Sequence, residues 1–125
     1  MPNPATVGDI EDRWRPLTPE EQVPASTFLA DAWWLLTARR PTLEADMLAG
    51  TVTAGNVVRV VAGMALRLLR NPEGYSSESI GSYSYQRDDL VASGRLHVTD
   101  EELGAVIPSG YRRTRSVRLV AYGET

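Results

Sequence analysis

The sequence predicts a mainly α-helical protein: a small helical bundle with an extended β-hairpin arm and a C-terminal extended tail. Two stretches, residues 18–40 and 51–71, carry apolar side chains at the spacing of amphipathic helices. Further along the chain the pattern changes to alternating Ser and Tyr, which is typical of an extended strand. With 125 residues the chain suits one compact domain. We therefore expect a helical domain over residues 1–107, including a hairpin arm at about 75–98, and an extension over residues 108–125.

Capping residues mark where the first helices begin. Residues 6–14 place a Thr before an acidic first turn, which predicts a short helix. Thr18 is followed by Pro19, which fits the first helical position, and Glu21 completes the pattern of a capping box. We expect this second helix to run to about residue 40 and to be kinked, but not broken, by Pro24.

Trp34 is the side chain of this helix that points to a second buried surface. The apolar residues around Phe28 and Leu36 form one stripe, and Trp34 projects to the opposite side of the helix. A small monomer gains little by exposing a Trp, so we predict that Trp34 lies in a subunit interface. The alternative is that a neighbouring loop or the C-terminal arm of the same chain covers it.

Residues 43–50 predict a short helix that ends at a glycine, and residues 51–71 give the strongest helical pattern of the chain. Apolar side chains cover most of the circumference of the longer helix, as in a central helix with neighbours on most sides. Its narrow polar sector holds Arg59, Gly63, Arg67 and Arg70. We expect these three Arg to pair with acidic side chains of an adjacent helix or, as subunit-interface residues, of an adjacent subunit.

Residues 75–87 form the predicted arm. Tyr83 and Tyr85 would lie on one face of this strand, and a short second strand would follow at residues 95–98. A two-stranded hairpin alone is marginal in water, so we predict that the arm pairs with a neighbouring subunit and that both Tyr residues lie in that interface. Thr99 then caps a short last helix with an acidic first turn.

The C-terminal extension is basic. Over residues 111–125 it carries four Arg and a single acidic residue, Glu124. Residues 116–122 have strand character without a core of their own, so we expect them to seek a sheet edge or an apolar pocket on another protein. The residues predicted to make this docking contact are Arg112, Arg113, Arg115, Arg118, Leu119 and Tyr122.

Recognisable catalytic and cofactor motifs are missing from the sequence. The chain has no Cys and one His, which excludes thiolate chemistry, disulfides and metal sites with several histidines. All of its basic residues are Arg, which excludes Schiff-base catalysis and the lysine of a P-loop. His97 and the adjacent Asp88 and Asp89 have ordinary structural explanations. We therefore predict no catalytic residue, no metal, no cofactor and no enzymatic activity.

Charge and hydropathy narrow the function classes further. A net charge of −3 at pH 7 argues against a protein whose main task is to grip a nucleic acid backbone. A small helical DNA-binding or regulatory module is the alternative. A DNA-binding module would need a basic recognition helix, whereas the best helix here is apolar. A free regulatory monomer would need no spare Trp, no Tyr arm and no unsupported basic strand. No apolar stretch approaches the length of a membrane span, and the start of the chain lacks the pattern of a signal peptide, so we expect neither a membrane partner nor secretion.

The order of elements resembles the head-to-tail adaptor (connector) proteins of long-tailed bacteriophages, especially those of actinobacterial hosts. The matching segments are residues 9–22, 28–41 and 57–85, with weaker likeness to residue 103. The most specific piece is RLLRNPEGYSSESIG, in which a long apolar helix ends in R-N-P-E-G before a Ser-rich segment.

This resemblance implies a structural virion protein at the head-to-tail interface, made in the host bacterial cytoplasm. Such proteins form a homo-oligomeric ring, a dodecamer, between the portal protein and the tail or stopper protein. DNA passes through the ring without sequence-specific binding, and the family pattern supplies no catalytic residue or cofactor. The C-terminal extension, which departs from the pattern, would dock on the portal or on a ring neighbour.

Overall fold

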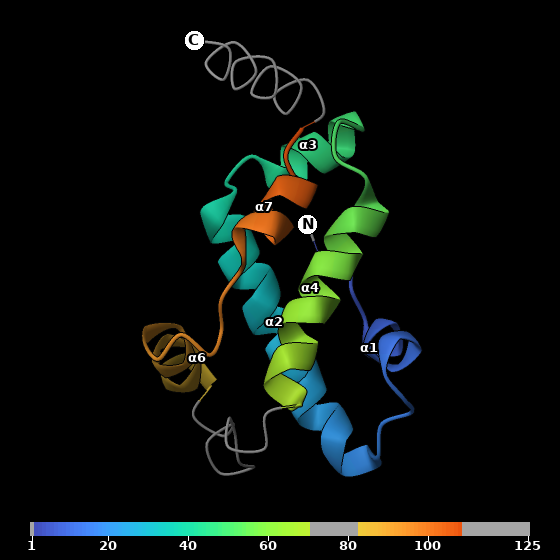
Figure 1. Cartoon of the computed structure of the whole chain (residues 1–125), viewed down its shortest axis with the longest axis vertical. Coiled ribbons are helices and arrows are strands. Elements are labelled where there is room, and N and C mark those ends of the chain that lie inside the picture. The colour runs from blue at the N-terminus through green and yellow to red at the C-terminus, as the bar shows by residue number, and fades with distance from the viewer. Residues whose placement is uncertain (1, 71–82, 109–125) are drawn as a thin grey trace, which may run out of the picture.

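Two long helices form the centre of the protein. The computed structural model describes residues 2–70 and 83–108. Helix α2 (Pro19–Arg39) and helix α4 (Ala54–Leu69) pack along each other, with α1 (Val7–Arg13) beside them and α7 (Asp100–Ala105) against α4 (Figure 1). Helix α3 (Leu43–Ala49) connects the two long helices, and α6 (Tyr83–Ala92) lies on the other side of the molecule from α1. The prediction of a mainly helical protein is confirmed.

The helices begin where the capping residues predict. The Thr18 hydroxyl accepts a hydrogen bond from the Glu21 N–H at 3.3 Å, and the Glu21 carboxylate accepts one from the Thr18 N–H at 3.0 Å. Thr99 forms the same reciprocal pair with Glu102 at the start of α7. Each box satisfies backbone donors that the first turn of a helix leaves unpaired. Helix α2 continues through Pro24 without a break.

Helix α4 is central, as its apolar circumference predicts. It contacts α1, α2 and α7, and its side chains Val57, Val61, Met64 and Leu68 are buried. From α2, the fully buried Phe28 and Leu36 complete this core. Arg59 and Arg70 remain exposed on the outer face of α4. One helix therefore supplies both the middle of the core and a polar surface.

The predicted β-hairpin is wrong wherever the structure describes it. Residues 83–92 form helix α6, residues 95–98 form no strand, and no strand occurs in the described ranges 2–70 and 83–108. Leu90 is fully buried, and its carbonyl oxygen accepts a hydrogen bond from the Leu96 N–H at 3.1 Å. Burial of Leu90 and Leu96 against the core favours a helix followed by a tight turn over an arm that extends into solvent. Residues 75–82 of the predicted arm and residues 109–125 of the extension lie outside the described residues.

A short connection, residues 50–53, leads from α3 to α4. Helix α3 ends at Gly50, whose φ of +81° lies in the left-handed region that glycine adopts without strain. Among the described helices, none is both long and apolar enough to cross a membrane.

Candidate functional site

The outward face of α2 is uncharged along most of its length. Between Gln22 and Arg39 the only charged residue is Asp31, and Asp31 is buried. The exposed side chains of this stretch include Val23, Ala30, Trp34 and Ala38, which lie at helical spacing on one side. We call Val23, Ala30, Trp34 and Ala38 the α2 stripe. In a chain with 23% charged residues, an exposed helix face of this kind is suited to contact with another protein surface.

Trp34 is covered in part by its own chain. The guanidinium carbon of Arg87, on α6, lies 4.1 Å from the centroid of the Trp34 ring. This cation–π contact holds α6 against α2, yet 38% of Trp34 stays exposed. Among the described residues, the side chain that lies over the Trp34 ring thus belongs to helix α6, and the C-terminal arm considered from the sequence lies outside the described residues. The exposed remainder of the ring is available to a second surface.

Arg67 pairs with an acidic residue on a neighbouring helix of the same chain. This is one of the two roles expected for Arg59, Arg67 and Arg70. Its guanidinium donates to both carboxylate oxygens of Glu102, at 2.8 and 2.9 Å, and to the backbone carbonyl of His97 at 2.8 Å. Burial opposes the ionisation of Glu102, but hydrogen bonds from Arg67 and from the Thr99 N–H outweigh it and hold the pKa of Glu102 below its ordinary value. Arg67 therefore fixes α7 to α4.

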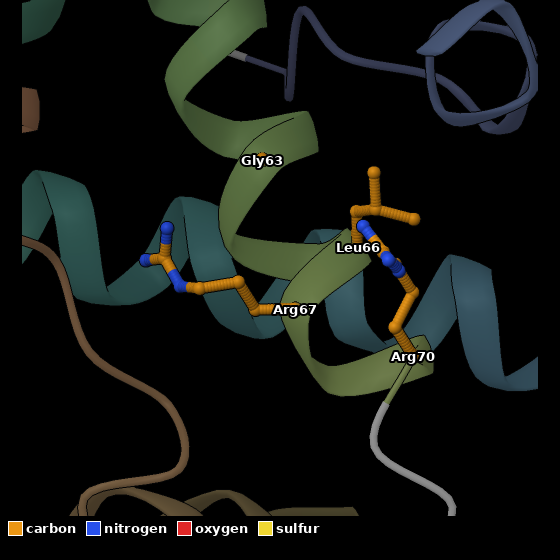
Figure 2. Close-up of a pocket in the computed structure, with 4 residues that line it drawn as sticks. All are labelled: Gly63, Leu66, Arg67 and Arg70. Atoms are coloured by element: carbon orange, nitrogen blue, oxygen red, sulfur yellow. The ribbon is translucent and has the colours of Figure 1, made fainter. Parts of the chain in front are cut away.

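Arg59 and Arg70 lie on the outer face of α4 beside two surface hollows. A hollow of about 440 Å³ is lined by Gly63, Leu66, Arg67 and Arg70. In Figure 2 the Arg67 and Arg70 side chains leave α4 on different sides, and Arg70 turns back toward Leu66. A second hollow, of about 390 Å³, is lined by Asn56, Arg59, Glu101, Glu102 and Ala105. The Arg67–Glu102 pair connects the walls of the two hollows.

Two of the predicted interface residues and all of the predicted docking residues lie beyond what the structure describes in atomic detail. Tyr83 and Tyr85 belong to α6, so they do not alternate across a strand. Arg112, Arg113, Arg115, Arg118, Leu119 and Tyr122 lie in residues 109–125, outside the described residues. The structure adds two residues that the sequence did not single out: Arg87 at Trp34, and Glu102 at Arg67.

His97 and Asp88, the residues considered as catalytic candidates, make ordinary structural contacts. The Nδ1 of His97 lies 2.9 Å from the carbonyl oxygen of Gly94, which closes the turn after α6. Asp88 is exposed, with Oδ1 3.9 Å from the Arg87 Nε. Within the described part of the chain, no group of three or more His, Asp or Glu could hold a metal ion.

Comparison with known proteins identifies the family. The family described as "Phage protein Gp19/Gp15/Gp42" matches residues 13–115. The chain belongs to this phage protein family. Members similar to it include the "Gene 19 protein" of Mycobacterium phage L5 and that of Mycobacterium phage D29. Each is 34% identical over 100 residues, which covers 78% of this chain and 79% of the relative. No solved structure matches the chain.

The region shared with the Gp19/Gp15/Gp42 family contains the α2 stripe and the two hollows beside α4. The matched range begins at the end of α1 and includes the α2 stripe, all of α4 and α7. It continues to residue 115, so the first part of the C-terminal extension also lies inside it. The expected kinship with proteins of actinobacterial phages is thereby confirmed at the level of the family.

Proposed function

We propose that the chain is a structural virion protein, a head-to-tail adaptor that forms a ring between the portal protein and the tail or stopper protein. The observation that carries this proposal is the α2 stripe. It exposes Trp34 and Val23 on a helix face without a charged side chain, on a domain with 23% charged residues. Such a face is stabilised by burial against another protein surface.

Membership of a phage family supports the proposal from a second direction. The relatives from phages L5 and D29 place the chain among actinobacteriophage proteins. The segment R-N-P-E-G, which carries the resemblance to adaptors, directly follows α4. A ring of small helical domains needs surfaces for neighbouring copies, and the α2 stripe is one such surface.

The proposal names the partners of the chain and assigns it no catalytic role. The chain would form a homo-oligomeric ring, contact the portal on one side and the tail or stopper on the other, and let DNA pass without sequence-specific binding. A net charge of −3 suits a conduit that does not arrest the DNA by tight phosphate contacts. The protein would act without a catalytic residue, metal or cofactor.

Co-expression with the portal protein of the same phage tests the proposal. Imaging of the purified particles should show an added ring bound to the portal. The mass of the isolated chain, measured by its elution from a sizing column at moderate salt, provides the comparison. A chain that stays monomeric and leaves the portal unchanged at all ratios would contradict the adaptor function.

A further inference from the structure

The outer face of α4 borders the two hollows described above and carries a basic side chain toward each end. Arg59, Leu66 and Arg70 lie at positions 0, 7 and 11 of one helix, and this spacing puts them within about 40° of each other around its axis. Gly63 lies between them and adds no side chain to the middle of the groove. A Cβ atom placed on Gly63 would have the Glu102 Oε2 at 3.6 Å as its nearest neighbour, which is ordinary contact. We call the surface of Asn56, Arg59, Gly63, Leu66 and Arg70 the α4 groove.

The charges of the α4 groove favour an acidic occupant. Among the described residues, neither Arg59 nor Arg70 has a carboxylate within 4.0 Å, whereas Arg67 is neutralised by Glu102. Glu101 lines the same hollow as Arg59 without forming an ion pair with it. Two exposed guanidinium groups therefore remain available to incoming carboxylates, and the Cα atoms that carry these side chains lie about 16 Å apart along the helix axis.

One segment of this chain has matching chemistry. Residues 71–82, NPEGYSSESIGS, carry Glu73 and Glu78 and no basic residue. In an extended backbone these two residues are about 16 Å apart, which equals the spacing of Arg59 and Arg70. The residues between them are Gly, Tyr and Ser, which are suited to pass over Gly63, where the helix has no side chain, and to place one aromatic ring against Leu66.

We propose that the α4 groove of one copy binds the acidic segment of residues 71–82 from a second copy, with Glu73 and Glu78 meeting Arg70 and Arg59. This inference rests on the proposed ring and names one contact between its copies. A second copy is favoured over the same chain by the length of the connection. Within one chain, residues 79–82 would have to return from Arg59 to the start of α6, which lies level with the opposite half of α4 (Figure 1).

Cysteine cross-linking tests the contact, because the natural chain has no Cys. Full-length Gly63→Cys and Ser76→Cys variants are mixed, oxidised mildly and separated without reductant. A disulfide-linked dimer of one copy of each variant is the expected product. Leu48→Cys replaces Gly63→Cys in the control, because Leu48 is 79% exposed on α3, away from the groove.

Charge reversal provides the second readout. The variant R59E/R70E should weaken association of the full chain by about tenfold or more, and the combination R59E/R70E/E73R/E78R should restore it. All four changes alter charged residues, of which the described ones, Arg59 and Arg70, are exposed, and circular dichroism checks that each variant is folded. Arg95→Glu, an exposed Arg outside the groove, should leave association unchanged.

The results separate this inference from the function on which it rests. A Gly63→Cys/Ser76→Cys chain that closes an internal disulfide as a monomer, equal cross-linking with Leu48→Cys, or association that ignores R59E/R70E would overturn the inference. If rings still form on the portal in those cases, the adaptor function stands. If the cross-link forms but no ring appears on the portal, the contact stands and the function fails.

Discussion

Trp34 contacts its own chain and is also partly exposed. Its removal should therefore affect both the stability of the monomer and its assembly. Its ring contacts Arg87 at 4.1 Å and remains 38% exposed. We predict that Trp34→Ala leaves the isolated domain folded and lowers its unfolding free energy by about 1 to 2 kcal/mol, because it removes one cation–π contact and the buried part of the ring. Assembly should lose about 2 kcal/mol or more, as for a residue at the centre of an interface. Denaturant melts of the monomer and the mass of the assembled particle measure the two effects.

Two further variants separate the roles of Trp34. Arg87→Gln removes the cation–π contact but keeps the indole, so it should lower the unfolding free energy by about 1 kcal/mol at most and leave assembly nearly intact. Leu48→Ala removes an exposed apolar side chain outside the α2 stripe and should change neither quantity. A loss of monomer stability in Trp34→Ala as large as its loss of assembly would assign Trp34 to the core instead.

The Arg67–Glu102 pair should make stability depend on pH in one direction. The folded-state pKa of Glu102 lies below the ordinary value of 4.5, so the pair stabilises the fold above that pH and is lost as pH falls through the folded pKa. Glu102→Gln should therefore flatten the dependence of unfolding free energy on pH below about 4.5. Arg67→Gln leaves a largely buried carboxylate without its main partner and should cost about 1 to 2 kcal/mol at neutral pH. Glu20→Gln, at an exposed position on α2, is the control. If the unfolding free energy of Glu102→Gln fell with pH below about 4.5 as steeply as that of the natural chain, the stabilising role of the Arg67–Glu102 pair would be contradicted.

Helix α6, which was expected from the sequence to be a strand, can be tested through its buried residue Leu90. Leu90 is fully buried, so Leu90→Ala should lower the unfolding free energy of the isolated protein by about 2 to 4 kcal/mol. The backbone amides near the end of α6 should exchange slowly with solvent in the monomer, since the Ser93 N–H already bonds to the Asp89 carbonyl at 2.9 Å. Ala92→Ser, at an exposed position of α6, is the matched control. Rapid exchange across α6 in the monomer, and slow exchange only after assembly, would instead support an arm that orders on its neighbour.

The elements that local chemistry determines could be predicted, and those that depend on distant packing could not. Thr18 and Thr99 mark helix starts through contacts three residues away, and the apolar period of α4 is visible in one stretch of chain. Helix α6 was missed because alternating Ser and Tyr also fit a strand, and its helical state depends on burying Leu90 against the core. The same limit applies to the candidate site. Trp34 could be selected from its place on a helical wheel, but its contact with Arg87 joins residues far apart in the sequence.

For the whole molecule, the positions of the two proposed contact surfaces matter most. Helices α2 and α4 pack against each other, and the exposed side chains of the α2 stripe and of Arg59 and Arg70 lie outside their shared contact. Two surfaces on different helices of one copy allow each copy to contact one neighbour with each surface. That is the head-to-tail arrangement from which closed rings are built, whereas a two-fold dimer uses the same surface on both copies.

The C-terminal extension gives the last prediction, because the core does not need it. The described core ends with Val106, which is buried, and the large side chains of α2 and α4 complete it. Deletion of residues 110–125 should therefore leave the melting temperature within a few degrees of the full chain, as measured by circular dichroism. Attachment to the portal should be abolished, as measured by co-purification, because the strand pattern of residues 116–122 suits a sheet edge or an apolar pocket of a protein.

DNA is the competing partner for the extension, since its four Arg would also suit phosphates. A variant with Arg112, Arg113, Arg115 and Arg118 all changed to Gln separates the two partners. If the extension docks on protein through Leu119 and Tyr122, this variant should keep part of its portal binding, and Leu119→Asp should lose more. Tight binding of duplex DNA by the intact chain, with affinity that falls steeply as salt rises, would assign the extension to DNA. Normal portal attachment after the deletion would also overturn docking by the extension, because the portal contact would then have to lie on the helical domain.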